Sequence, residues 1–194
     1  MKTIYYQLLL DCSYSMEPAW ELISSQVRTH LQRLQEQHSA TNASDSRFLS
    51  RLIAIPSPGD FNSFSSTVEP AIKQLNTLVP QGGASLSDTL WELLRQIKTT
   101  FDTNASQTST YLLVMITDGW ENNATIQPWQ VKECLVSLQK QVNLEIWVVG
   151  PEHPILYERR LLPVKGLENG TLKAEDLDCC FKFIESHLHQ FLKE

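Results

Sequence analysis

The chain has 194 residues, of which 42% are hydrophobic and 20% are charged, and its formal net charge is −6 at pH 7. These values are typical of a globular protein with one substantial core, so we expect a single domain over residues 1–194. The acidic balance and the lack of a basic stripe argue against a nucleic-acid partner, because phosphate backbones require lysine and arginine contacts.

The mainly apolar run near the start, residues 4–10, is too short to resemble a secretory leader and meets Asp11 without a small-residue cleavage site. No run approaches the roughly 18 apolar residues of a membrane-spanning helix. We therefore expect a cytoplasmic protein that makes no membrane contact.

Strand-like and helix-like segments alternate along the chain. Residues Thr3–Leu10 are apolar on both faces, as in a central parallel strand that helices cover on both sides. Further strands are expected at Phe48–Ile55, Tyr111–Ile116 and Leu144–Val149, and weaker ones near Asn62–Thr67 and Leu172. Helices are expected from Pro18, over Leu86–Phe101, from Pro128, around Ile155–Leu162 and over Ala174–Leu192. Three tryptophans fall within these patterns and are expected in the core: Trp91, Trp129 and Trp147.

Strands that alternate with helices predict an α/β fold, with one doubly wound, mostly parallel sheet and helices on both of its faces. Ligands bind such sheets beyond the carboxyl ends of the strands, where the strand order reverses. Asp11 and Asp118 each end a strand, and we expect these two strands to be neighbours. The fold therefore brings two carboxylates to one edge of the sheet.

Residues 11–15 read Asp-Cys-Ser-Tyr-Ser and place a carboxylate and two hydroxyls at the tip of a buried strand. Oxygen donors of this kind favour Mg²⁺, Mn²⁺ or Ca²⁺ over zinc. Taken singly, Ser13 or Ser15 could cap the next helix, and Asp118-Gly119 could form an ordinary turn. The joint placement of Asp11, Ser13, Ser15 and Asp118 favours a cation site.

These motifs, and the order of strands and helices along nearly the whole chain, resemble the von Willebrand factor type A (vWA) domain family. That family carries D-x-S-x-S after its first strand and T-D-G in a third loop, which together form a metal-ion-dependent adhesion site. Asp11, Ser13 and Ser15 match the first motif, and Thr117-Asp118-Gly119 matches the other. The resemblance implies a Rossmann-like vWA fold, a bound Mg²⁺ (or Mn²⁺ or Ca²⁺) and no enzymatic activity.

The second loop departs from the family pattern, because Ala84 stands where the family has a threonine that contributes a ligand oxygen. Ser85 could replace the missing hydroxyl if the loop shifts by one residue. Alternatively, Ser85 and Asp88 form a capping box at the start of the next helix, which their spacing favours. Mg²⁺ readily keeps several waters, so the loss of one hydroxyl is compatible with binding.

The resemblance further implies a protein–protein interaction module, in which an acidic residue of a partner protein completes the coordination of the cation. We expect Tyr14, Trp120 and Glu121, which lie on the same loops, to contact this partner, since aromatic residues are enriched at binding hot spots. The chain resembles stand-alone bacterial members of the family, which act in stress-response or defence-type systems. An assembly scaffold is therefore expected.

Two alternative functions stay open from the sequence. One is a Mg-dependent phosphohydrolase that uses Asp11 and Asp118, although such enzymes normally carry a second acid where this chain has Ser13. The other is a metal-free, degenerate vWA scaffold in which Ala84 marks a lost site and the partner binds another surface.

Overall fold

The computed structural model describes residues 2–40, 46–56, 61, 63–103, 109–119, 123–150, 160–164, 167 and 171–193. The strands are β1 (Lys2–Asp11), β2 (Ser46–Ile55), β3 (Ser109–Ile116), β4 (Asn143–Gly150) and β5 (Arg160–Pro163). A 3-10 helix, η1 (Tyr14–Ala19), precedes the α-helices, which are α1 (Trp20–Ala40), α2 (Glu69–Leu75), α3 (Leu86–Thr103), α4 (Pro128–Gln139) and α5 (Ala174–Lys193).

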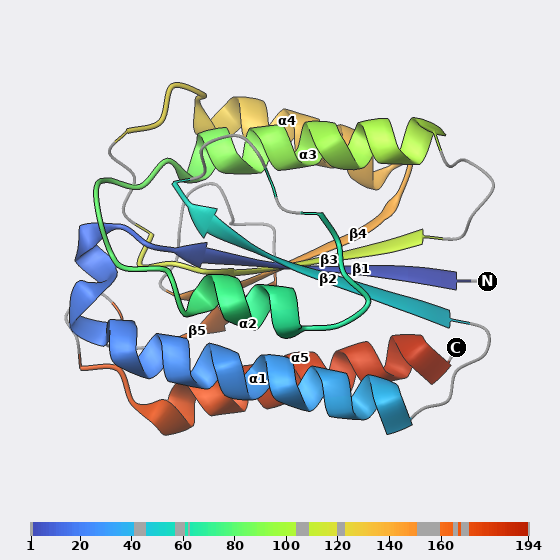
Figure 1. Ribbon diagram of the computed structural model, residues 1–194. Helices are drawn as coiled ribbons and strands as arrows, with labels where there is room; N and C mark the ends of the chain where they lie inside the picture. The colour runs from blue at the N-terminus through green and yellow to red at the C-terminus, as the bar shows by residue number, and fades with distance from the viewer. Residues whose placement is uncertain are drawn as a thin grey trace.

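Within the described ranges the strands form one parallel sheet in the order β2-β1-β3-β4-β5. Figure 1 shows α3 and α4 over one face of this sheet and α1, α2 and α5 over the other. The predicted α/β fold, a doubly wound sheet covered on both faces, is therefore confirmed. None of the helices in these ranges has the length and apolar character needed to cross a bilayer.

The apolar run of β1 is continuous because both faces of this central strand are buried. Tyr6, Leu8 and Leu10 join the hydrophobic layer formed with α1, α2 and α5. Leu9 points to the other face and joins the layer formed with α3 and α4. Each of these leucines is fully buried, which stabilises the fold by about 1.5–3 kcal/mol relative to an exposed side chain.

The strand order reverses between β1 and β3, because the chain adds β2 on one side of β1 and then β3, β4 and β5 on the other. Such a reversal leaves a crevice beyond the carboxyl ends of the two strands, where α/β proteins bind ligands. The register pairs Leu10 with Ile116, so Asp11 and Thr117 leave the sheet as neighbours.

Gly150, at the end of β4, permits this close arrangement. A Cβ atom at position 150 would collide with the backbone carbonyl of Thr117, and Gly150 has a φ of +155°. The backbone N–H of Thr117 donates to the Val149 carbonyl at 3.2 Å, which ties the end of β3 to β4. The absence of a side chain at position 150 thus lets the segment after β3 pack against β4.

Two elements predicted between β4 and α5 differ from the structure where residues are described. The helix expected around Ile155–Leu162 overlaps β5, and residues 151–159 lie outside the described part. A four-residue segment carries too little periodicity to separate helix from strand, and pairing with β4 makes it a strand. Leu172, expected in a strand, lies in irregular structure just before α5.

Other differences concern short elements in the first half of the chain. Pro18 lies within η1 rather than in the first turn of α1. The edge strand expected near Asn62–Thr67 is reduced to one antiparallel bridge, in which Ser65 pairs with Ser50 of β2. Helix α2 was not predicted, although Pro70 in its first turn is a common start signal.

A buried polar chain connects β1 to the helices α1 and α5. The Tyr6 hydroxyl and His30 Nε2 are 2.6 Å apart, and His30 Nδ1 lies 2.7 Å from Glu185 Oε1. Arg33 Nε donates to the same Glu185 oxygen at 2.9 Å. Burial lowers the pKa of His30, while the hydrogen bond and charge of Glu185 oppose that shift and the charge of Arg33 adds to it. His30 is therefore a neutral structural residue rather than a ligand.

Acidification should destabilise the protein through His30. The unfolded chain binds a proton at this histidine below its ordinary pKa of about 6.5, whereas the folded chain binds it only at lower pH. The stability that comes from keeping His30 neutral is fully present above about pH 6.5. It is lost as the pH falls below this value, by at most ~1.4 kcal/mol per pH unit. Urea unfolding of the wild type and of His30→Gln between pH 7.5 and 5.5 measures this, and equal pH slopes would contradict it.

Candidate cation site

Three loops meet beyond the carboxyl ends of β1 and β3. Main-chain hydrogen bonds join the segment after β1 to the loop before α3, since Gln81 N donates to Cys12 O at 2.7 Å and Tyr14 N donates to Gly82 O at 3.1 Å. Asn123, on the segment after β3, donates its backbone N–H to Ala84 O at 3.1 Å. The backbone therefore holds the three loops of the predicted site together.

Asp11 lies at the centre of this arrangement and is fully buried. Its Oδ1 accepts from the backbone N–H of Ser13 at 2.9 Å, and its Oδ2 accepts from the Thr117 hydroxyl at 2.7 Å. Thr117 Oγ1 in turn accepts from Gly119 N at 3.0 Å. Thr117 is thus a positioning residue that fixes the carboxylate of Asp11 and the turn around Asp118.

The electrostatics of the site favour a positive charge. Burial raises the pKa of Asp11, and the nearby charge of Asp118 raises it further, while hydrogen bonds from Ser13 and Thr117 lower it. Asp118 is also nearly buried, at 3% exposure. A buried carboxylate is costly unless donors or a counter-charge compensate it, so a cation near Asp11 would favour the ionised form of this side chain.

A cavity of about 460 Å³ lies among the three loops, and neither Asp11 nor Asp118 is among the residues that line it. Ser13 and Ser15 line it, and their hydroxyl oxygens lie 2.9 Å apart. Gly82, Gly83 and Ala84 form another part of the lining, and Gly82 has a φ of +69°, which glycine adopts without strain. The structure therefore brings two hydroxyls to a cavity at the predicted edge of the sheet.

The donor set suits a hard divalent cation. Carboxylate and hydroxyl oxygens are ligands for Mg²⁺, Mn²⁺ or Ca²⁺, and Asp11, Ser13, Ser15 and Asp118 provide only oxygen. In the described part of the chain, no three histidine, cysteine, aspartate or glutamate side chains gather in a way that could hold a metal. A zinc-type cluster is therefore not found among these residues, and a cation here would depend on the two hydroxyls.

The loop before α3 brings no side-chain hydroxyl to the cavity, although the family pattern has a threonine there. Ala84 is 1% exposed and brings a methyl group to the cavity instead of a hydroxyl. Ser85 is not among the residues that line the cavity. Asn123 does line it and was missed by the sequence analysis, although its position five residues after Asp118 on the same segment was a usable signal.

The predicted capping box of Ser85 and Asp88 was wrong. The carboxylate of Asp88 accepts hydrogen bonds from the backbone N–H groups of Thr125 and Ile126, at 2.9 and 2.7 Å, and from the Thr125 hydroxyl at 3.1 Å. These donors compete successfully for the carboxylate because the segment before α4 presents three of them together. Asp88 therefore anchors that segment to the first turn of α3.

The predicted partner-binding residues can be placed only in part. Tyr14 is 64% exposed and lines the cavity, as a contact residue requires. Trp120 and Glu121 lie outside the described residues.

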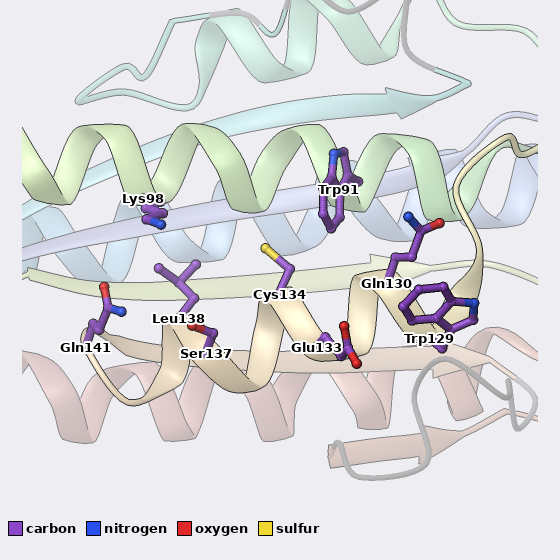
Figure 2. A pocket seen from close by; sticks show the side chains of 9 residues that line it. All are labelled: Trp91, Lys98, Trp129, Gln130, Glu133, Cys134, Ser137, Leu138 and Gln141. Atoms are coloured by element: carbon purple, nitrogen blue, oxygen red, sulfur yellow. The ribbon is translucent and has the colours of Figure 1, made fainter.

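A second cavity, of about 480 Å³, lies between α3 and α4. Figure 2 shows Trp91 and Lys98 on α3 facing Cys134 and Leu138 on α4, with Trp129 at one end. Trp129 was expected in the core and is 60% exposed, and Trp91 is half-buried, whereas Trp147 is buried as expected. Helical periodicity shows which residues share a face, but not whether another element covers it.

No family model and no curated protein sequence matches the chain. Solved structures match its fold. The pilus adhesin SpaC from Lactobacillus rhamnosus GG, in an open conformation, aligns at TM-score 0.64 and 11% identity over 99% of this chain and 30% of its own. Proximal thread matrix protein 1 from the mussel byssus aligns at TM-score 0.57 and 16% identity, over 94% of this chain and 47% of its own.

The VWA domain of SpRpn10 aligns at TM-score 0.51 and 14% identity over 76% of each chain. Identities this low show a shared fold and nothing finer. The chain therefore has a vWA-like fold, and it spans less than half the length of the adhesin and of the byssus protein.

Removal of the Thr117 hydroxyl should loosen the site. Thr117→Val deprives the buried Asp11 Oδ2 of its donor and Gly119 N of its acceptor, which we expect to cost about 1–3 kcal/mol of unfolding free energy. Thr117→Ser keeps the hydroxyl and is the matched control. Urea denaturation measures both, and a Thr117→Val protein no less stable than Thr117→Ser would contradict the role given to this hydroxyl.

Proposed function

We propose that this chain, with its vWA-like fold, is a non-enzymatic protein–protein interaction module that binds a partner's carboxylate through a divalent cation, Mg²⁺ or else Mn²⁺ or Ca²⁺. The observation that carries the proposal is that Ser13 and Ser15 line a cavity at the strand-order reversal, while the carboxylates of Asp11 and Asp118 are buried where the neighbouring strands β1 and β3 end. All four side chains offer hard oxygen atoms of the kind that Mg²⁺ and Ca²⁺ bind.

The four residues would have two different roles in binding the cation. Ser13 and Ser15 line the cavity, and their hydroxyl oxygens would act as ligands of the cation. Asp11 and Asp118 are buried where β1 and β3 end and would supply the balancing negative charge. When bound, the cation supplies a positive charge at the rim, which attracts an acidic side chain although the chain itself has a net charge of −6.

Specificity for the partner would come from the rim. Tyr14 is exposed beside the cavity and offers an aromatic contact, and Trp120 and Glu121 follow Asp118 closely in the sequence. Aromatic residues at the centre of an interface contribute large binding energies. A chain of this kind would serve as an assembly scaffold in a bacterial stress-response or defence-type system.

Phosphohydrolase activity is disfavoured by the geometry of Asp11. An aspartate nucleophile must present one carboxylate oxygen to the substrate, whereas Asp11 is fully buried with one oxygen bonded to Ser13 N and the other to the Thr117 hydroxyl. Ser13 also stands where such enzymes carry a second acid. Phosphomonoester hydrolysis with Mg²⁺ that Asp11→Asn abolishes would overturn this assignment.

The second candidate function is a metal-free scaffold, and the cavity between α3 and α4 is the observation that favours it. Trp129 is exposed there, and Trp91 lines the same cavity, so a partner could bury two aromatic side chains without any cation. Loss of partner binding in Trp129→Ala, together with full binding in the presence of a chelator, would favour this candidate over the first.

Removal of the two hydroxyls should abolish cation binding. We expect millimolar Mg²⁺ or Mn²⁺ to raise the melting temperature of the wild type, because a ligand that binds only the folded state stabilises it by about 2.7 kcal/mol at 100 times its Kd. The double variant Ser13→Ala/Ser15→Ala should show no such rise.

The matched control is Ser24→Ala/Ser25→Ala, which removes two serine hydroxyls from α1 and should respond to metal as the wild type does. A wild type whose melting temperature and titration heat are both unchanged by metal would contradict the proposed cation site.

A further inference from the structure

We infer that Asn123 supplies the oxygen ligand that Ala84 lacks, so that the site is completed by the segment after β3 and not by Ser85. This inference rests on the proposed cation site and assigns one more of its ligands. An asparagine side-chain carbonyl is a hard oxygen donor of the kind that Mg²⁺ and Ca²⁺ accept. Asn123 therefore brings suitable chemistry to the side of the cavity where the loop before α3 offers a methyl group.

Asn123 lies next to Ala84 in the structure. Its backbone N–H donates to Ala84 O at 3.1 Å, and both residues line the same cavity as Ser13 and Ser15. Ser85, the other candidate, follows Ala84 immediately but does not line the cavity. The residue that can replace the hydroxyl missing at Ala84 is thus Asn123, on the segment after β3.

Asn123 also has a side chain available for a ligand. It is exposed, and no residue in the described part of the chain forms a hydrogen bond with its side-chain amide. The segment that carries it is anchored two and three residues later, where Thr125 and Ile126 donate to Asp88. Asp88 is therefore a positioning residue that holds Asn123 beside the cavity.

The neutrality of Asn123 fits the proposed partner. Asp11 and Asp118 already balance a divalent cation, so a third carboxylate would make the occupied site negative and repel an acidic partner. An amide completes the ligand set without adding charge. Asn123→Asp should therefore bind the cation more tightly and bind a carboxylate-bearing partner less well.

Calorimetric titration of the folded protein with MnCl₂ and MgCl₂ tests the inference. We expect Asn123→Ala to raise the Kd for metal about tenfold or more, in the range of losses seen when a residue supporting a metal site is removed. Ser85→Ala, the matched control, should stay within about twofold of the wild type, since that side chain does not line the cavity. Adding Ala84→Thr to Asn123→Ala should restore binding, because the threonine hydroxyl fills the same gap.

The outcomes separate this inference from the proposed function. If the wild type binds metal and Asn123→Ala has the same Kd, the role of Asn123 is overturned while the proposed cation site stands. The same conclusion follows if Ser85→Ala weakens metal binding and Asn123→Ala does not. A wild type that binds no metal would overturn both. Thermal unfolding without metal serves as the folding control, and Asn123→Ala should match the wild type, because the exposed amide has no hydrogen bond with the described residues.

Discussion

The loops beyond the carboxyl ends of β1 and β3 depend on the hydrogen bonds that the Asp11 carboxylate accepts. This carboxylate is fully buried where β1 ends, and a buried charge is tolerated only when strong donors or an opposite charge compensate it. Ser13 N and the Thr117 hydroxyl provide the donors, so one side chain ties the loop after β1 to the segment after β3. The opposite charge, in the proposed function, is the cation itself.

The remaining contacts keep the loops in register with that carboxylate. Gly150 lets the segment after β3 approach β4, since any side chain there would collide with Thr117. Gln81 and Tyr14 connect the loop before α3 to the loop after β1 through the backbone. Asp88 holds the segment that carries Asn123. Preorganised ligands lower the entropic cost of binding, which would favour the proposed cation site.

The sequence predicted the sheet, and the positions of Asp11 and Asp118 where two neighbouring strands end, for physical reasons. Buried parallel strands leave long apolar runs, and the reversal of strand order places residues such as Asp11 and Asp118 at one edge. The position of Asn123 shortly after Asp118 was a signal in the sequence, but its place beside Ala84 was not predictable, because the path of that segment depends on Asp88, 37 residues away in the sequence from Thr125. Nor could the sequence predict β5, whose conformation is decided by pairing with β4 rather than by its own four residues.

The proposed function requires a divalent cation at the hydroxyls of Ser13 and Ser15, with Asp11 and Asp118 supplying negative charge. Anomalous diffraction at the manganese edge, from crystals grown with MnCl₂, tests it most directly. The predicted result is a single strong peak in this cavity, within coordination distance of the Ser13 and Ser15 oxygens and of Asn123 Oδ1. Data with no anomalous peak in the cavity, at a manganese concentration that occupies ordinary oxygen sites, would contradict it.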